Sequence, residues 1–229
     1  MSHEDDEKQT SYPVGKIADL YSTYYRMHGD SLASLGYPKG AQDARFRAMF
    51  QIGQLQNASI LDVGCGFGHM LDYLRSWNIN ARYTGIDITP PMIDIARRKH
   101  PDADFRLLNI LECSLEERWD WVFLVGAFNA APAREGWWEL VQQMMMKMWE
   151  LCRIGMAADF LSSHVDFQKP GSFHADPGQV FAFAKKLTRR VTLRHDYMAY
   201  EFMVYLYKDQ DLTANNVFTD FQSNLPGLR

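Results

Sequence analysis

Hydrophobic residues follow two different periods along the middle of the chain. Short apolar runs predict buried strands over residues 59–63, 82–88, 104–110, 121–125 and 153–160. Between these runs, apolar residues recur at helical spacing and predict helices over residues 68–77, 91–99, 137–151 and 177–187. Asp176 as a cap and Pro177 at the first helical position mark the start of the last helix. This alternation is typical of a parallel sheet covered on both faces.

The two ends of the chain follow another pattern. Residues 191–197 and 201–207 predict two strands, with too few residues between them for a crossover helix, so we expect an antiparallel arrangement. Near the other end, Ala41–Ile52 carries apolar residues at helical spacing, and residues 12–36 are rich in Tyr and Ser.

These patterns predict one α/β domain with additions at its ends. We expect the domain over residues 58–208, preceded by a helical cap or lid over residues 12–57. A disordered tail is predicted over residues 1–11, and a C-terminal tail over residues 209–229.

Composition narrows the class of protein. The chain has 229 residues, 47% of them hydrophobic and 14% aromatic, which is enough to bury the core of one domain. A net charge of -4 argues against a dedicated nucleic-acid binder. Three cysteines without CxxC spacing favour a reducing, cytoplasmic compartment. The longest apolar run, 121–133, is too short to span a membrane, and the acidic start is unlike a signal peptide.

A glycine-rich loop joins the first predicted strand to the next helix, in the run Leu61-Asp62-Val63-Gly64-Cys65-Gly66-Phe67-Gly68. Such a loop lets the backbone approach a ligand at the carboxyl end of the strand, although a plain strand–helix turn is the alternative. A dinucleotide fingerprint would place its third glycine at position 69, which holds His69. Asp62 also disfavours a pyrophosphate and suits a ligand with a cationic amino group.

A second carboxylate follows at the end of the second predicted strand. Asp87 lies 19 residues after Gly68, where an acid can accept both hydroxyls of a ribose. A solvated loop residue or a helix cap is the alternative interpretation of Asp87.

Together these residues resemble a known family. The pattern Asp62-x-Gly64-x-Gly66-x-Gly68 with Asp87 is similar to that of the class I S-adenosylmethionine-dependent methyltransferases, over roughly residues 58–208. The resemblance implies a doubly wound, mostly parallel, seven-stranded Rossmann-like sheet with a C-terminal antiparallel strand. It also implies S-adenosylmethionine (SAM) as the cofactor and S-adenosylhomocysteine (SAH) as its product.

The resemblance assigns parts of the cofactor to matching positions. The methionine part would contact the glycine loop and the end of the fourth strand, at Asp62, Gly64, Cys65, Gly66, Gly68 and Gly126. The ribose and adenine would contact the ends of the second and third strands, at Asp87, Ile88, Met92, Asn109 and Ile110. The family often has Asp at the position of Asn109, whose amide oxygen can still accept a hydrogen bond from the adenine amino group.

The acceptor is less clearly indicated. Residues 125–129 lack the Asn/Asp-Pro-Pro-Tyr/Phe motif of nucleic-acid amino-methylating enzymes and the Pro-Cys pair of cytosine C5 enzymes. The C-terminal half resembles a bacterial subgroup of methyltransferases associated with small or peptidic metabolites. We therefore predict methyl transfer to O or N of a small molecule, without nucleic-acid or membrane partners, by a monomer or homodimer. An RNA or protein methyltransferase and a non-catalytic SAM-binding regulatory subunit stay open as alternatives.

Histidines supply the candidate general bases. His164 and His174 lie in the loop after the fifth predicted strand, and solvent-exposed loop positions are the alternative for both. His195 is interpreted as a hydrogen-bonded core residue and His100 as a surface residue, and His69 as a ligand contact or a helix cap. The spacing of His and Cys gives no support for a metal site.

The N-terminal segment supplies a candidate lid. Tyr21, Tyr25 and His28 share helical spacing, and tyrosine rings can attract a sulfonium, although ordinary helix packing is the alternative. Arg45 is a candidate partner for the carboxylate of the cofactor.

Overall fold

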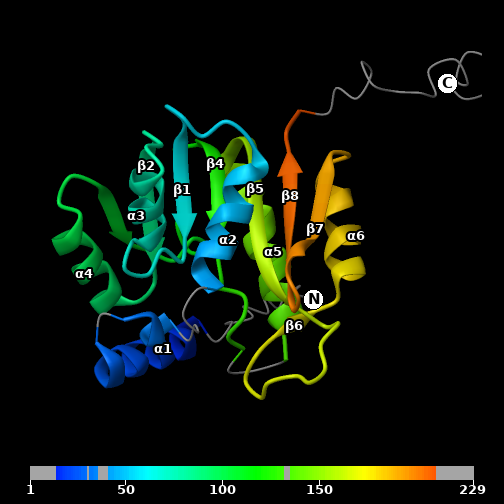
Figure 1. Ribbon diagram of the computed structural model, residues 1–229, viewed down its shortest axis with the longest axis horizontal. Coiled ribbons are helices and arrows are strands. Elements are labelled where there is room, and N and C mark those ends of the chain that lie inside the picture. Colours follow the sequence, from blue (N-terminus) through cyan, green and yellow to red (C-terminus); the bar gives the residue numbers. More distant parts are fainter. Residues whose placement is uncertain (1–13, 30, 36–40, 132–134, 210–229) are drawn as a thin grey trace, which may run out of the picture.

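The computed structural model describes residues 14–29, 31–35, 41–131 and 135–209. Its central sheet has the strand order β3-β2-β1-β4-β5-β8-β7, with a short β6 paired to β5 (Figure 1). The strands are β1 (Ser59–Val63), β2 (Arg82–Asp87), β3 (Asp104–Leu107), β4 (Trp119–Leu124), β5 (Cys152–Ser162), β6 (His174–Ala175), β7 (Val191–Met198) and β8 (Glu201–Tyr207). β8 runs antiparallel between β5 and β7, whereas β1 to β5 are mutually parallel. The predicted fold class is confirmed.

Helices cover both faces of the sheet. One face packs against α2 (Ala41–Met49), α3 (His69–Ser76) and α4 (Pro90–Lys99), and the other against α5 (Trp137–Leu151) and α6 (Pro177–Leu187). Residues of β1 alternate between these two cores, with Ile60 in the first and Leu61 and Val63 in the second. Because both faces are covered, every residue of β1 is buried, which explains its nearly continuous apolar sequence.

The N-terminal segment lies at one end of the sheet and against one face of it. Figure 1 shows α1 (Val14–His28) across the end toward which the arrowhead of β1 points, with α2 in front of the sheet. Two short 3₁₀ turns, η1 (Leu32–Leu35) and η2 (Phe50–Ile52), complete the segment. Its division from the rest as a separate cap stays a prediction, and both predicted tails except residue 209 lie outside the described residues.

Of the strands that the sequence predicted, β3 and β5 differ most from the prediction at their carboxyl ends. β3 ends at Leu107, three residues early, because the chain turns at residues 110–112, where the Glu112 N–H donates to the carbonyl of Asn109 at 3.2 Å. β5 runs on to Ser162, and its end pairs with β6, a two-residue strand that hydrophobic periodicity did not indicate. Strands that short carry no readable period.

His100 is buried rather than on the surface, so that prediction is wrong. Its exposed fraction is 4%, and its ring stacks on Phe105 at 5.8 Å between centroids. The space exists because Gly68 lacks a side chain: a Cβ there would lie 2.7 Å from Phe105 and 3.1 Å from His100. Burial lowers the pKa of His100.

Candidate functional site

A cleft of about 1090 Å³, its open mouth included, lies at the carboxyl ends of β1, β2 and β4. This is the point where the strand order reverses, the usual ligand position in open α/β sheets. The predicted residues that line it are Tyr21, Asp62, Gly64, Cys65, Gly66, Asp87, Ile88, Met92, Asn109, Ile110 and Gly126. Five other predicted site residues are not among the described residues that line the cleft: Gly68, Tyr25, His28, His164 and His174.

The glycine loop is pinned to the end of β2. The N–H groups of Gly64 and Cys65 both donate to the carbonyl of Ile86, at 2.8 and 3.0 Å. Gly64 has a φ of 76°, a conformation that a side chain would strain, and a Cβ there would lie 2.9 Å from the Cβ of Ala127. The loop is therefore open toward the cleft and tightly packed behind.

Gly68 stands behind the loop instead of on the cleft. It precedes α3 and makes room for Phe105 and His100, as described above. Its place in the motif is thus accounted for by packing, and a direct contact with the cofactor stays a prediction.

Asp62 is a buried carboxylate at the bottom of the cleft. Its exposed fraction is 4%, and it accepts a hydrogen bond of 2.7 Å from the hydroxyl of Tyr83. Burial raises the pKa of Asp62 to about 7, which the Tyr83 hydrogen bond partly opposes. A desolvated carboxylate of this kind is suited to a ligand that brings an ammonium group.

The carboxylate of Asp87 binds two backbone segments. One carboxylate oxygen accepts from the Gly66 N–H at 2.9 Å, and the other from the Thr89 N–H at 2.8 Å. Burial raises the pKa of Asp87, while these backbone donors oppose the rise. Asp87 therefore ties the glycine loop to the start of α4 and also lines the cleft. Asp87 is buried at the end of β2 and the cap of α4 is Thr89, so Asp87 is neither a solvated loop residue nor the cap of that helix, and its contact with a ligand stays a prediction.

Two other residues predicted to contact the cofactor, Asn109 and Gly126, are held by hydrogen bonds within the protein. The side-chain oxygen of Asn109 accepts from the Leu111 N–H at 3.1 Å, so an adenine contact through that oxygen has to share it. The N–H of Gly126 donates to Asp159 at 2.5 Å, which fixes the backbone at the end of β4.

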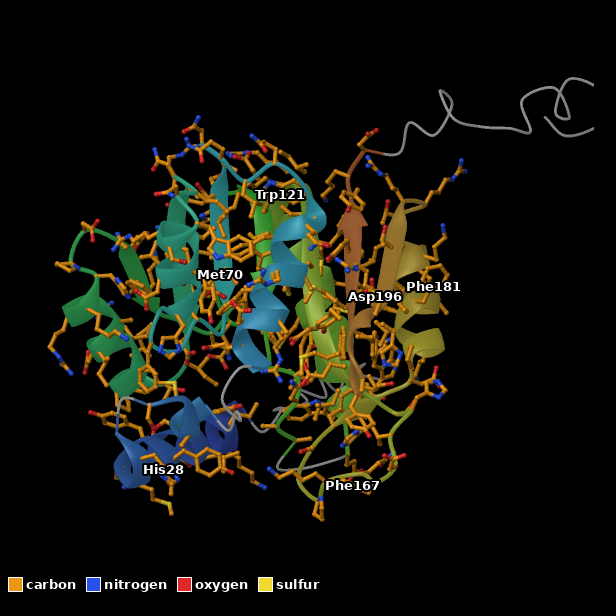
Figure 2. All side chains as sticks on the ribbon, in the orientation of Figure 1. His28, Met70, Trp121, Phe167, Phe181 and Asp196 are labelled. Carbon is orange, nitrogen blue, oxygen red and sulfur yellow. The ribbon has the colours of Figure 1, made fainter. Side chains whose placement is uncertain are left out.

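The three lid candidates have different environments. Tyr21 lines the cleft, and burial, followed by the charge of Asp87, raises its pKa. Tyr25 packs against Phe67, with 6.1 Å between ring centroids. His28 is exposed at the end of α1 (Figure 2). The structure therefore places Tyr21 at the cleft and the other two outside its described lining.

The predicted base candidates lie at the β5–β6 connection. His174 is held by the backbone on both ring nitrogens: Nδ1 is 2.8 Å from the carbonyl of Ser162, and Nε2 accepts from the Lys169 N–H at 3.3 Å. His164 is exposed, with its ring 6.5 Å from that of His195. Their roles as bases stay predictions.

The environments of Arg45 and His195 differ from those that the sequence suggested. Arg45 pairs with the carboxylates of Asp159 and Glu201, and a contact of Arg45 with the carboxylate of the cofactor stays a prediction. His195 is half-buried against Phe202, and its Nε2 has no hydrogen-bond partner among the described residues. The expected hydrogen-bonded core histidine is therefore wrong for that nitrogen.

Sequence reasoning missed part of one wall of the cleft. Gln42 and Phe46 of α2 line it beside His69, a residue that the sequence suggested as a ligand contact or a helix cap, and the Gln42 amide lies 3.3 Å from Nδ1 of His69. Helical spacing predicted α2, and residues 42 and 46 share one face of it. Nothing in the sequence showed that this face turns toward the cleft. Three residues of α5, Trp137, Leu140 and Met144, were missed in the same way.

Comparisons with known proteins agree on one family. Residues 60–148 match the methyltransferase domain family. A Mycobacterium tuberculosis protein named as methyltransferase Rv1506c is 30% identical over 158 residues, which are 66% of this chain and 93% of that protein.

Solved structures share the fold at low sequence identity. Magnesium protoporphyrin IX methyltransferase from Synechocystis PCC 6803, with bound SAM, has a TM-score of 0.63 and 14% identity, covering 86% of this chain and 98% of that one. The plantazolicin methyltransferase BpumL, in complex with a triazolic desmethylPZN analog and SAH, has a TM-score of 0.61 and 14% identity, covering 86% and 98%.

The chain belongs to the class I SAM-dependent methyltransferases. It is an enzyme of that class, and SAM is its cofactor. None of its described helices is long and apolar enough to cross a bilayer. Within the same residues, no group of three His, Cys, Asp or Glu side chains is arranged to hold a metal ion.

Proposed function

We propose that this methyltransferase transfers the methyl group of SAM to an oxygen or nitrogen of a small-molecule metabolite. The observation that carries the proposal is the extent of the cleft, which continues from the two acids to a second wall formed by Ile17, Tyr21, Gln42, Phe46 and His69. A recess walled by α1 and α2 suits a compact acceptor better than a polymer. Two fold neighbours, the magnesium protoporphyrin IX methyltransferase and the plantazolicin methyltransferase bound to a desmethylPZN analog, support the same substrate class.

The chain's own residues would hold the cofactor in a defined order along the cleft. Asp62 meets the ammonium group of its methionine part, and Asp87 accepts from the ribose hydroxyls. Ile88 and Met92 supply apolar surface for the adenine. When bound, SAM supplies an electrophilic methyl group on a sulfonium. What the protein adds is mainly orientation of an acceptor in line with that group.

An acceptor that carries a proton also requires a base within hydrogen-bond reach. His164 and His174 are the bases that the sequence suggested. Among the described residues that line the cleft, His69 is the histidine, and Gln42 beside its Nδ1 orients the ring. We therefore add His69 to the two earlier candidates, as the one already at the acceptor wall.

Location and assembly belong to the same proposal. The thiols of Cys65, Cys113 and Cys152 are all free, which fits the reducing cytoplasm in which we place the enzyme. We expect a monomer or homodimer, which light scattering after size-exclusion chromatography measures directly.

Transfer of a tritiated methyl group tests the proposal. The enzyme is incubated with labelled SAM and a bacterial extract divided into metabolite, RNA and protein fractions. We expect label in the metabolite fraction, and its loss in Asp87→Ala. Label confined to RNA or protein would overturn the proposal in favour of a macromolecular acceptor. SAH binding without transfer to any fraction would favour a regulatory subunit.

The same assay separates the base candidates. Transfer that falls at least about tenfold in His69→Ala and is unchanged in His164→Ala and His174→Ala would assign the base to the acceptor wall. The reverse pattern would return the assignment to the β5–β6 connection.

A further inference from the structure

Three charged side chains form a buried cluster beneath α2, beside the cleft. The side chains of Arg45, Asp159 and Glu201 are 3%, 0% and 6% exposed. Nε of Arg45 lies 2.6 Å from an oxygen of Glu201 and 3.3 Å from an oxygen of Asp159. Replacing a buried ion pair by apolar groups is often neutral or stabilising, so stability alone is a weak reason for such a cluster.

The cluster reaches the cofactor cleft through Asp159. The second oxygen of this carboxylate accepts from the N–H of Gly126 at 2.5 Å. Gly126 lines the cleft with a φ of 75°, a conformation suited to glycine. Ala127, the next residue, lies so close to Gly64 that a Cβ on Gly64 would be 2.9 Å from its Cβ. The end of β4 therefore packs directly on the glycine loop.

The cluster also reaches the acceptor wall through Arg45. Arg45 belongs to α2, and two other residues of that helix, Gln42 and Phe46, line the cleft. Asp159 is a residue of β5, and Glu201 is the first residue of β8. The carboxylate of Asp159 thus accepts a hydrogen bond from Gly126 in the wall of the cleft and forms an ion pair with Arg45 of α2.

We propose that Asp159 is a positioning residue for the methyl donor, which fixes Gly126 and α2 relative to each other. Without the carboxylate, the buried N–H of Gly126 loses its acceptor, and the backbone at residues 126–129 shifts to find another. Because this segment packs on the glycine loop, the shift deforms the part of the cleft predicted to hold the methionine moiety. The inference concerns the binding of the methyl donor, and it does not depend on which acceptor the enzyme methylates.

The two neighbours of Asp159 make an amide a poor substitute. One carboxylate oxygen of Asp159 accepts a hydrogen bond from the Gly126 N–H, and the other lies 3.3 Å from Nε of Arg45 in an ion pair without a hydrogen bond. Asparagine has one acceptor oxygen and an uncharged NH₂ group, so either the Gly126 N–H or the Arg45 guanidinium would face that NH₂ group. Asp159→Asn therefore disturbs the site with little change in volume, which makes it the safer variant for folding.

Calorimetric titration with SAH tests the role of Asp159. We expect an affinity about tenfold weaker in Asp159→Ala and several-fold weaker in Asp159→Asn. Asp120→Ala is the matched control, because Asp120 also accepts a backbone N–H, that of Ser59 at 2.8 Å, but near the opposite end of β4. It should lower the melting temperature and leave the SAH affinity unchanged.

Hydrogen exchange supplies a second readout. Amides at residues 126–129 should exchange faster in both Asp159 variants and at the wild-type rate in Asp120→Ala. Wild-type SAH affinity in a folded Asp159→Ala, or an equal loss in Asp120→Ala, would overturn the proposal. If Asp159→Ala does not fold, Asp159→Asn decides in the same two measurements. Absence of SAH binding to the wild type would instead refute the cofactor assignment.

Discussion

At the scale of single residues, the two acids of the cleft differ in the hydrogen-bond donors that their carboxylates already have within the protein. Asp87 has two backbone donors, whereas Asp62 has the Tyr83 hydroxyl. Both are buried and have raised pKa values, the pKa of Asp62 being about 7. Without a ligand, part of the Asp62 population is therefore protonated at neutral pH. An incoming ammonium group favours its ionised form, so binding and proton loss are linked.

SAH binding should release protons from Asp62 at pH 6. The affinity should rise between pH 6 and pH 8, because raising the pH through the pKa of about 7 ionises the carboxylate that the ligand selects. Calorimetry in buffers of different ionisation enthalpy counts the protons. Asp62→Asn should bind more weakly and release fewer protons. Proton uptake by the wild type, or release that is undiminished in Asp62→Asn, would contradict this assignment.

Gly64→Ala should abolish detectable SAH binding. The substitution puts a Cβ 2.9 Å from Ala127 and strains a residue with φ of 76°, a backbone cost of about 1–2 kcal/mol before the clash is counted. Gly171→Ala is the matched control, because Gly171 has the same φ of 76° with nothing within 4 Å of the added Cβ. It should be destabilised by a comparable strain and bind SAH normally. Equal binding by the two variants would show that the Gly64 contact does not shape the cleft.

At the scale of elements, α1 is the helix that covers part of the cleft. It contributes Ile17 and Tyr21 to the lining and packs on α4, where Tyr21 and Tyr25 contact the small core of Phe67 and Met92. This placement supports a lid role for the predicted cap, and it makes Tyr21 the residue of that helix through which the role can be tested.

Tyr21→Ala should weaken SAH binding several-fold, because it removes a half-buried aromatic surface beside Asp87. Met27→Ala, on the same helix but 67% exposed, should have no effect. Dissociation constants from calorimetry compare the two. Equal affinities for both variants would mean that α1 is a packing element without a lid function.

The elements also show how far the sequence could be interpreted. Periodicity was sufficient for β1 to β5 and for the helices between them, because each buries a continuous face. The glycine loop and Asp87 were recognisable because their chemistry is local in sequence. The contacts of Arg45 and Gln42 were not recognisable, because their partners are distant in sequence. Glu201 lies 156 residues from Arg45, and His69 lies 27 residues from Gln42. Contacts of that range depend on the packing of α2 on the sheet, which no local pattern encodes.

At the scale of the whole molecule, buried acids give the stability an unusual pH dependence. Burial raises the pKa of Asp62 to about 7. Burial also raises the pKa of Asp159, opposed by the charge of Arg45 and helped by the charge of Glu201. Tyr197 faces the same pair of carboxylates. A carboxyl with a raised folded-state pKa stabilises the fold below its unfolded pKa, and that stability is lost as pH rises through the folded value.

The free energy of unfolding without ligand should therefore decrease between pH 5 and pH 8, by up to a few kcal/mol in total. Urea unfolding across this range measures the decrease. Asp62→Asn and Asp159→Asn should each make it shallower, and Asp120→Asn, whose pKa in the wild type is lowered, should not. A stability that rises steadily from pH 5 to pH 8 would contradict the raised pKa values.

In this account, the donor is held at the carboxyl ends of the strands that line the cleft, and the proposed acceptor space is walled by α1 and α2. Calorimetric titration of the full chain with SAH tests this account most directly. We expect binding with one SAH per chain and an affinity at least about a hundredfold lower in Asp87→Ala, which loses the ribose acceptor and the clamp on the glycine loop. Absence of binding to the wild type, or undiminished binding to Asp87→Ala, would contradict it.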